Sequence, residues 1–210
     1  MKITADDWKP IPRFIFHLLY RLYVPWDIGR VQPAVADLHE RGELSGRILD
    51  VGCGFGETTI YLAQKGYDVR GIDLVPAAIN KARSNALEKG LHDLFFVHDA
   101  LRLDELTDRF DTLIDVGLFH TLSDRDRRRY ETSVYSVLKE SGRLFMLCFS
   151  SLYAGFLGPR RVSESAIYDL FAPSWKIEYI RQTCYLARFP RGGADAWLVC
   201  MTRLGKPDAA

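Results

Sequence analysis

Three glycines separated by single residues form the first pattern in this sequence with a clear chemical use. The short apolar run Arg47–Val51 leads into Gly52-Cys53-Gly54-Phe55-Gly56. Glycine allows a tight turn from a strand into a helix and lets the backbone approach a ligand closely. The spacing is GxGxG, not the GxGxxG of dinucleotide-binding folds. We therefore expect a small-molecule site at this turn, which includes Asp50 just before the glycines.

Acidic residues follow each of the next three expected strands, at Asp73, Asp99 and Asp115. A carboxylate at Asp73 can accept hydrogen bonds from both hydroxyls of a ribose. Asp99, next to Ala100, is placed to accept from an adenine amino group, and Asp115 to lie near a cationic end of the ligand. The alternatives are a solvated loop residue for Asp73, a turn cap for Asp99, and a support between loops for Asp115.

His120 follows the fourth expected strand and is the residue best suited to proton transfer. Near neutral pH an imidazole can take a proton from an attacking O–H, N–H or S–H group. The alternative is a packed or hydrogen-bonded wall of the pocket, and the sequence does not decide between the two. Cys53 is expected to fill space between the glycines and not to act as a nucleophile.

The elements that position these residues alternate between strands and helices. Strands are expected at 47–51, 68–73, 94–97, 110–116 and 144–149, with helices at 32–40, 57–64, 76–90 and 163–171 between or after them. This order predicts a single doubly wound, mostly parallel sheet with helices on both faces. Such sheets bind ligands at the carboxyl ends of their strands, where the candidate residues fall.

The two ends of the chain carry further expectations. Pro12 to Tyr23 reads as an amphipathic helix, for which an active-site cover, plain packing and peripheral membrane contact all stay open. Ser123 and Asp126 resemble a capping box, opening a helix that Gly142 should end. The segments 176–186 and 194–202 should pair as an antiparallel hairpin, and the second is apolar enough to be an interior strand.

Composition places the chain among ordinary globular proteins. It has 210 residues, 48% apolar and 26% charged, and a formal net charge of +1. This gives no global field for nucleic acid or an anionic membrane. The four cysteines form no CxxC or metal-ligand spacing. We expect no metal and no secretory signal, and therefore a cytoplasmic protein.

Taken together, these motifs resemble the class I S-adenosylmethionine-dependent methyltransferases over nearly all of residues 24–203. The elements that carry the resemblance are LDVGCGFGETT, VRGIDL, the HDA triplet, DTLIDVGLFHTL and LKESGRLFML. The resemblance implies a seven-stranded sheet with an inserted antiparallel last strand. It also implies a cofactor site, whose residues would be Asp50, Gly52, Cys53, Gly54, Gly56, Asp73, Leu74, Asp99, Ala100, Asp115 and Gly117.

The segment Pro25–Pro33 resembles the thiopurine and thiol/halide methyltransferases and their bacterial relatives, although Val31 stands where relatives often have proline. This implies that Trp26 and Arg30 lie near the cofactor. It also implies an N-terminal cover at 1–42, a methyltransferase domain at 43–204 and a flexible tail at 205–210. The substrate-facing residues would be Phe119, His120, Tyr153, Phe156 and Arg160.

The expected reaction moves the methyl of S-adenosylmethionine to an O, N or S atom of a small, aromatic or heterocyclic molecule and releases S-adenosylhomocysteine. A thiol/halide methyltransferase and a methyltransferase for a macromolecule are the alternatives within the family. A NAD-dependent oxidoreductase and a non-catalytic binding module are the alternatives outside it. We expect no nucleic acid, membrane or obligate protein partner.

Overall fold

The computed structural model describes residues 12–22, 24–154, 159–188 and 192–205. Its helices are α1 (Arg13–Leu22), α2 (Pro33–Glu40), α3 (Glu57–Gln64), α4 (Pro76–Leu87), α5 (Asp124–Val137) and α6 (Glu164–Phe171). Its strands are β1 (Ile48–Val51), β2 (Val69–Asp73), β3 (Phe95–Val97), β4 (Phe110–Val116), β5 (Leu138–Phe149), β6 (Trp175–Tyr185) and β7 (Ala194–Arg203). Two short 3-10 helices, η2 (Leu103–Glu105) and η3 (Phe119–Thr121), were not expected.

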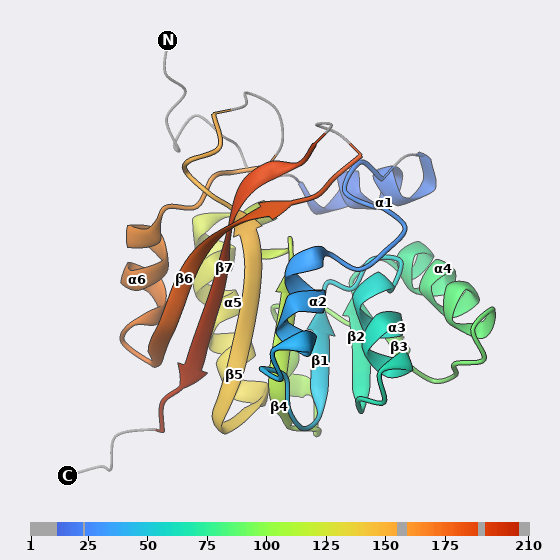
Figure 1. The fold of residues 1–210 in the computed structure, drawn as a ribbon, viewed down its shortest axis with the longest axis horizontal. Helices are drawn as coiled ribbons and strands as arrows, with labels where there is room; N and C mark the ends of the chain where they lie inside the picture. Colours follow the sequence, from blue (N-terminus) through green and yellow to red (C-terminus); the bar gives the residue numbers. More distant parts are fainter. Residues whose placement is uncertain (1–11, 23, 155–158, 189–191, 206–210) are drawn as a thin grey trace.

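The seven strands form one sheet in the order β3-β2-β1-β4-β5-β7-β6 (Figure 1). Strands β1 to β5 pair in parallel, whereas β7 pairs antiparallel with both β5 and β6. The doubly wound, mostly parallel sheet is therefore confirmed, as is the hairpin with its interior last strand.

Helices cover both faces of the sheet, and each face has its own apolar core. Along β5, Leu144, Met146 and Cys148 pack on the side of α5 and α6, while Phe145, Leu147 and Phe149 pack on the side of α2. This alternation follows from the period of two in a strand. Figure 1 shows α2 in front of the sheet and α5 behind it, with α1 lying across one end.

The boundary between α5 and β5 differs from the expectation. Ser123 caps α5 through a hydrogen bond from the Asp126 N–H at 3.1 Å, as expected, but the helix ends at Val137 and not at Gly142. Leu138 is already extended and pairs with Phe110, which buries its side chain in the sheet. From the sequence, an apolar residue at position 138 fits both a continued helix and a buried strand. The pairing with Phe110 selects the strand.

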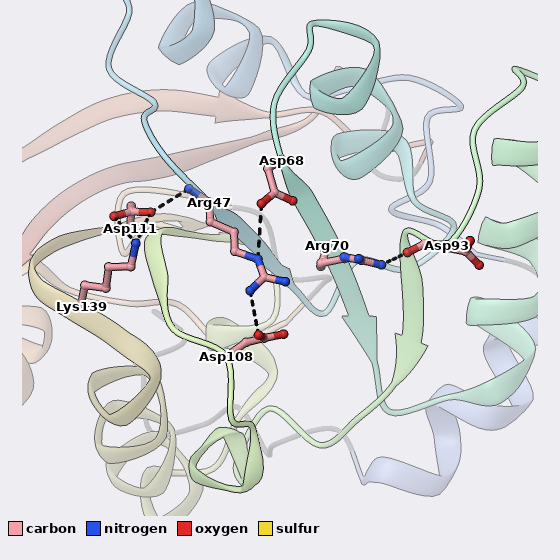
Figure 2. Close-up of polar contacts among 7 residues, drawn as sticks. All are labelled: Arg47, Asp68, Arg70, Asp93, Asp108, Asp111 and Lys139. Atoms are coloured by element: carbon pink, nitrogen blue, oxygen red, sulfur yellow. Dashed lines mark hydrogen bonds and ion pairs between the residues drawn. The ribbon is translucent and has the colours of Figure 1, made fainter.

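Polar contacts hold the amino ends of the strands together (Figure 2). The Arg47 side chain contacts Asp108 at 2.7 Å and Asp68 at 3.4 Å, and the Arg47 N–H donates to Asp111 at 2.8 Å. Lys139 approaches the same Asp111 carboxylate at 2.9 Å. These contacts join the starts of β1, β2, β4 and β5. They hold together the amino ends of these strands, whereas the candidate residues gather at the carboxyl ends.

Within the described part of the chain, none of the helices has the length and apolar character needed to cross a bilayer.

Candidate functional site

A cavity of about 680 Å³ lies where the segments following β1, β2, β3 and β4 meet. Phe16, Leu19 and Tyr20 of α1 and the segment after α1 line it from the other side. Twelve of the expected site residues line this cavity. They are Trp26, Arg30, Asp50, Gly52, Cys53, Gly54, Asp73, Leu74, Asp99, Ala100, Gly117 and His120.

The glycine turn after β1 shapes one wall of the cavity. Gly52 has a φ of +77°, and a Cβ on it would lie 3.1 Å from the Leu118 side chain. Beneath the turn, Asp50 is buried and accepts a hydrogen bond from the Thr59 hydroxyl at 2.6 Å. Burial raises the pKa of Asp50 to about 7, and the nearby Asp115 carboxylate adds to this shift.

Asp73, at the end of β2, is the most heavily hydrogen-bonded carboxylate of the cavity. Its Oδ1 accepts from the Val75 N–H at 2.9 Å, and its Oδ2 accepts from the Gly54 N–H at 3.1 Å and the Tyr20 hydroxyl at 3.2 Å. Burial raises its pKa. Asp99 also lines the cavity, and its side chain accepts from the Leu101 N–H at 2.9 Å, so the expected alternative of a turn cap applies to it as well.

His120 lies in η3, shortly after β4, and faces aromatic rings of β5 and β6. The ring centroids of Phe149 and Tyr185 are 4.8 Å and 5.8 Å from that of His120. The Phe149 N–H donates a hydrogen bond to His120 Nδ1 at 3.1 Å. Burial lowers the pKa of His120 to about 3, and the charges of Arg127 and Arg161 contribute. The imidazole is therefore neutral at physiological pH.

Five expected site residues do not line the cavity, and each has a structural reason. Asp115 is buried under the turn after β4, where it accepts hydrogen bonds from the Leu118 and Phe119 N–H groups and the Tyr130 hydroxyl. This corresponds to the alternative of a support between loops. Burial raises the pKa of Asp115 to about 6.

Phe119 points away from the cavity into the core, where its ring lies between those of Tyr130 and Phe171. Gly56 has a φ of +90° and starts α3, with Phe95 2.6 Å from the position of an added Cβ. Neither residue lines the cavity, so a direct ligand contact by either stays a prediction.

Tyr153 and Arg160 are engaged elsewhere. The Tyr153 ring packs against Phe149 and under the Arg161 guanidinium, and Arg160 forms an ion pair with Asp124. Phe156 lies outside the described residues. Of the five expected substrate-facing residues, His120 is the one in the described part of the chain that lines the cavity.

Several residues of the cavity were not anticipated. Tyr20, Asp27, Glu57, Phe149 and Tyr185 all line it. Glu57 faces Asp27, and burial together with this second carboxylate raises the pKa of Glu57 to about 7. The position of Glu57 directly after the glycine turn was a signal that could have identified it. Phe149 and Tyr185 lie near the ends of strands that no ligand-binding motif marks.

Comparison with known proteins agrees with this arrangement. A family profile described as a methyltransferase domain matches residues 48–142. The chain is 33% identical over 177 residues to 2-heptyl-1-hydroxyquinolin-4(1H)-one methyltransferase of Mycobacteroides abscessus, a match that covers 81% of this chain and 78% of the relative. The chain belongs to the class I S-adenosylmethionine-dependent methyltransferases.

Solved structures support the assignment of this methyltransferase. One, described under the heading of converting a disulfide bond into a thioacetal group during echinomycin biosynthesis, matches with a TM-score of 0.82 and 33% identity over 92% of this chain and 93% of that one. Magnesium protoporphyrin IX methyltransferase of Synechocystis with bound S-adenosylmethionine shares the fold, with a TM-score of 0.62 and 21% identity over 81% and 76% of the two chains.

The chemistry of the cavity wall suits S-adenosylmethionine, the cofactor of this methyltransferase. Its carboxylates and acids are Asp27, Asp50, Glu57, Asp73, Asp99 and Asp126. The cofactor carries a sulfonium and an ammonium, and acidic walls with low-dielectric surroundings concentrate cations. In the described part of the chain, no group of three His, Cys, Asp or Glu side chains is placed to hold a metal ion.

Proposed function

We propose that this methyltransferase acts on an oxygen, nitrogen or sulfur atom of a small aromatic or heterocyclic molecule that is free in the cytoplasm. The observation that carries the proposal is the composition of the cavity beyond the glycine turn. Its walls there are aromatic rings and imidazole, contributed by Phe16, Trp26, His120, Phe149 and Tyr185. Flat apolar surfaces of this kind favour a planar acceptor through stacking and edge contacts.

The cofactor would be held by the residues that follow β1, β2 and β3. In this proposal Asp73 accepts the ribose hydroxyls, Asp99 and Ala100 lie along the adenine, and the turn at Gly52–Gly54 holds the methionine portion. Trp26 and Arg30 close the site from the N-terminal side. Bound there, the cofactor supplies a methyl group already activated by its positive sulfur.

The remaining task of the protein is alignment and exclusion of water. A nucleophile held within about 3–3.5 Å of the methyl carbon gains most of the available rate enhancement from positioning. The face of α1 that carries Phe16, Leu19 and Tyr20 lines the cavity opposite the sheet. We therefore propose that residues 1–42 form a cover for a methyltransferase domain at 43–204, with a flexible tail after it.

The relatives indicate which acceptors to test first. The relative from Mycobacteroides abscessus is named for a hydroxylated quinolone, which is a planar heterocycle with an acidic oxygen. The protein of the echinomycin study is described by chemistry at sulfur. A hydroxylated heterocycle is thus the first candidate. A thiol, as in the thiol/halide methyltransferases, is the second.

The deciding experiment measures release of S-adenosylhomocysteine from S-adenosylmethionine. Purified protein would be incubated with hydroxylated quinolines and quinolones, phenols, aromatic thiols and halide salts. We expect turnover on the planar oxygen or sulfur acceptors and its loss in Asp73→Asn. Turnover confined to RNA or protein added as a control would refute the proposal, as would S-adenosylhomocysteine binding with no turnover on any acceptor.

A further inference from the structure

Two arginine side chains are buried behind His120. Arg127 of α5 and Arg161, which precedes α6, are each 6% exposed. The Arg127 guanidinium lies over the Phe119 ring at 4.7 Å, and its Nε donates to the Phe119 carbonyl at 3.4 Å. Its Nη2 is buried and has no hydrogen-bond partner in the part of the chain that the structure describes. Within the described residues, no carboxylate forms an ion pair with Arg127.

Burying an unpaired cation is energetically unfavourable, because its charge loses the stabilisation that water provides. Asp124 of α5, whose charge acts on Arg127, forms its ion pair with Arg160. Burial and the neighbouring Arg160 charge lower the pKa of Arg127 to about 10. Burial also lowers the pKa of Arg161, whose guanidinium lies over the Tyr153 ring at 4.5 Å. A negative charge nearby would stabilise the buried guanidinium of Arg127.

The ring nitrogens of His120 have distinct roles. Nδ1 accepts the Phe149 N–H and so carries no proton in the neutral ring. The proton must then be on Nε2, which has no hydrogen-bond partner among the described residues although the side chain lines the cavity. An imidazole in this tautomer can donate a hydrogen bond into the cavity. It has no free lone pair with which to take a proton from an acceptor.

Acidic and basic side chains therefore lie at different ends of the cavity. The cofactor end carries the carboxyl groups of Asp27, Asp50, Glu57 and Asp73. At the other end, Arg127 and Arg161 approach His120 from α5 and from the segment before α6, and the Tyr185 ring approaches from β6. Asp126 of α5 lines the cavity as well, and Asp115 of β4 lies under the same turn with its oxygens hydrogen-bonded.

We propose that the space in front of His120 is an anion subsite, which binds the methyl acceptor as its conjugate base, an oxyanion or a thiolate. This rests on the proposed function, because it identifies the ionisation state and class of the acceptor. His120 Nε2–H donates a hydrogen bond to the anion, and Arg127 and Arg161 stabilise its charge from behind. Among planar acceptors, those that ionise in water near neutral pH are preferred.

The transfer then needs no proton acceptor on the protein. The acceptor has lost its proton to water before it binds. Its lone pair forms the new bond to the methyl carbon while the carbon–sulfur bond breaks and sulfur keeps that electron pair. An anion and a sulfonium thus become two uncharged centres, and His120 remains a neutral donor throughout.

The first test is spectroscopic and involves no methyl transfer. The protein saturated with S-adenosylhomocysteine is titrated with 4-nitrophenol and 4-nitrothiophenol, whose conjugate bases absorb at longer wavelength than the acids. We expect the bound probe to have a pKa lower by about one unit or more than the free probe, since opposite charges shift a pKa by this amount. An unchanged or raised pKa would overturn the proposal, as would a preference for the uncharged 4-nitroanisole.

Variants assign the effect to residues. His120→Phe keeps a ring of similar shape without a donor, and Arg161→Gln removes a charge. Each should reduce the pKa shift of the probe, whereas Arg128→Gln, next to Arg127 on α5 but exposed, should not. Equal shifts in His120→Phe, Arg161→Gln and the wild type would contradict the assignment.

A protein-only measurement keeps the inference separate from the proposed function. The ¹⁵N NMR signals of His120 should show a proton on Nε2 alone, and this state should persist down to about pH 5. A proton on Nδ1, or an imidazolium at neutral pH, would refute the donor role. If the probes bind as anions but no acceptor is methylated, the anion subsite stands and the proposed function fails.

Turnover adds a further distinction. With a series of phenols of different acidity, the break in kcat/KM against pH should move with the pKa of each phenol. A break at one fixed pH for the whole series would indicate a titrating group on the protein and contradict the proposal.

Discussion

The hydroxyl of Tyr20 donates a hydrogen bond to Asp73 Oδ2 at 3.2 Å, and this contact connects α1 to the end of β2 across the cavity. The two residues are far apart in the sequence, and the same carboxylate oxygen also accepts the Gly54 N–H. The carboxylate that we propose for ribose binding therefore also anchors the cover helix. If Asp73 binds the ribose as proposed, we expect cofactor binding and the position of α1 to be coupled through this one side chain.

Removing the hydroxyl should loosen α1 without unfolding the sheet. Tyr20→Phe keeps the ring contacts with Trp26 and Phe55 but loses the hydrogen bond to a carboxylate, which contributes about 1.5–3 kcal/mol. We expect amide hydrogen exchange in residues 13–22 to become roughly tenfold to hundredfold faster. Tyr135→Phe, which loses a bond to the Leu204 carbonyl, is the matched control. Exchange in α1 equal to that of the wild type would show that the contact does not hold the helix.

Asp73 should dominate cofactor affinity. Asp73→Asn removes the charge and one acceptor site while the volume stays the same, so we expect S-adenosylhomocysteine to bind roughly tenfold to hundredfold more weakly in calorimetry. Asp108→Asn, which breaks an exposed ion pair at the amino ends of the strands, should leave the affinity unchanged. Comparable losses in both variants would mean that the effect is not local to the cavity.

The buried carboxyl of Asp50 should make the unliganded protein less stable as the pH rises. Its pKa is raised from 3.8 to about 7, so the native state binds the proton more tightly than the unfolded chain does. The contribution of this protonation to the free energy of unfolding is fully present at low pH and is lost as the pH rises from about 4 to about 7. Glu57 and Asp115 act in the same direction.

Urea unfolding at about pH 5 and about pH 8 measures this slope. Each unit of pKa shift corresponds to about 1.4 kcal/mol. The free energy of unfolding should therefore fall less between the two pH values in Asp50→Asn than in the wild type, by roughly 1–3 kcal/mol. Asp104→Asn, an exposed residue in η2, should not alter it. A steeper decrease in Asp50→Asn would reverse the assigned sign.

Binding of S-adenosylmethionine near neutral pH should release protons. A cation placed beside Asp50 and Glu57 lowers their pKa values from about 7, so both groups ionise as the ligand enters. Calorimetry in two buffers of different ionisation enthalpy reports the number released. S-adenosylhomocysteine, which lacks the sulfonium charge, should release fewer, and Glu57→Gln should release fewer with either ligand. Proton uptake would contradict this account of the acidic wall.

Two glycines at the ends of α3 offer a matched test of crowding. Gly56 and Gly66 have φ values of +90° and +88°, but an added Cβ would lie 2.6 Å from Phe95 at Gly56 and meet nothing within 4 Å at Gly66. Gly66→Ala should lower the free energy of unfolding by about 1–2 kcal/mol through backbone strain alone. Gly56→Ala should add about 1–3 kcal/mol for overpacking. Equal losses in thermal or urea unfolding would show that Phe95 moves aside freely.

Much of the fold could be predicted because its signals are local. The apolar run at 110–116 and the glycine at the end of 57–64 mark β4 and α3 at their observed bounds. The end of α5 could not be predicted, since Leu138 fits the apolar face of a helix and also a buried strand. Only its pairing with Phe110, which is distant in the sequence, selects the strand.

The cavity wall that follows the ends of β1 to β4 was largely predictable, whereas the aromatic wall was not. Phe119 and His120 are adjacent, but the 3-10 turn directs one side chain into the core and the other to the cavity. A sequence pattern does not reveal which of the two faces inward. Phe149 lies on β5 and Tyr185 on β6, and these two strands are connected in the sheet through β7. The aromatic wall therefore depends on tertiary structure.

The position of β7 also has a consequence for biosynthesis. Its residues, Ala194–Arg203, leave the ribosome after β5 and β6, yet they lie between these two strands. Until they emerge, β5 is an unpaired edge and β6 has no neighbour in the sheet, which are conditions that favour association between nascent chains. The part of the sheet formed by β1 to β4 can form early, but the aromatic wall that includes Tyr185 is completed only after β7 has been synthesised.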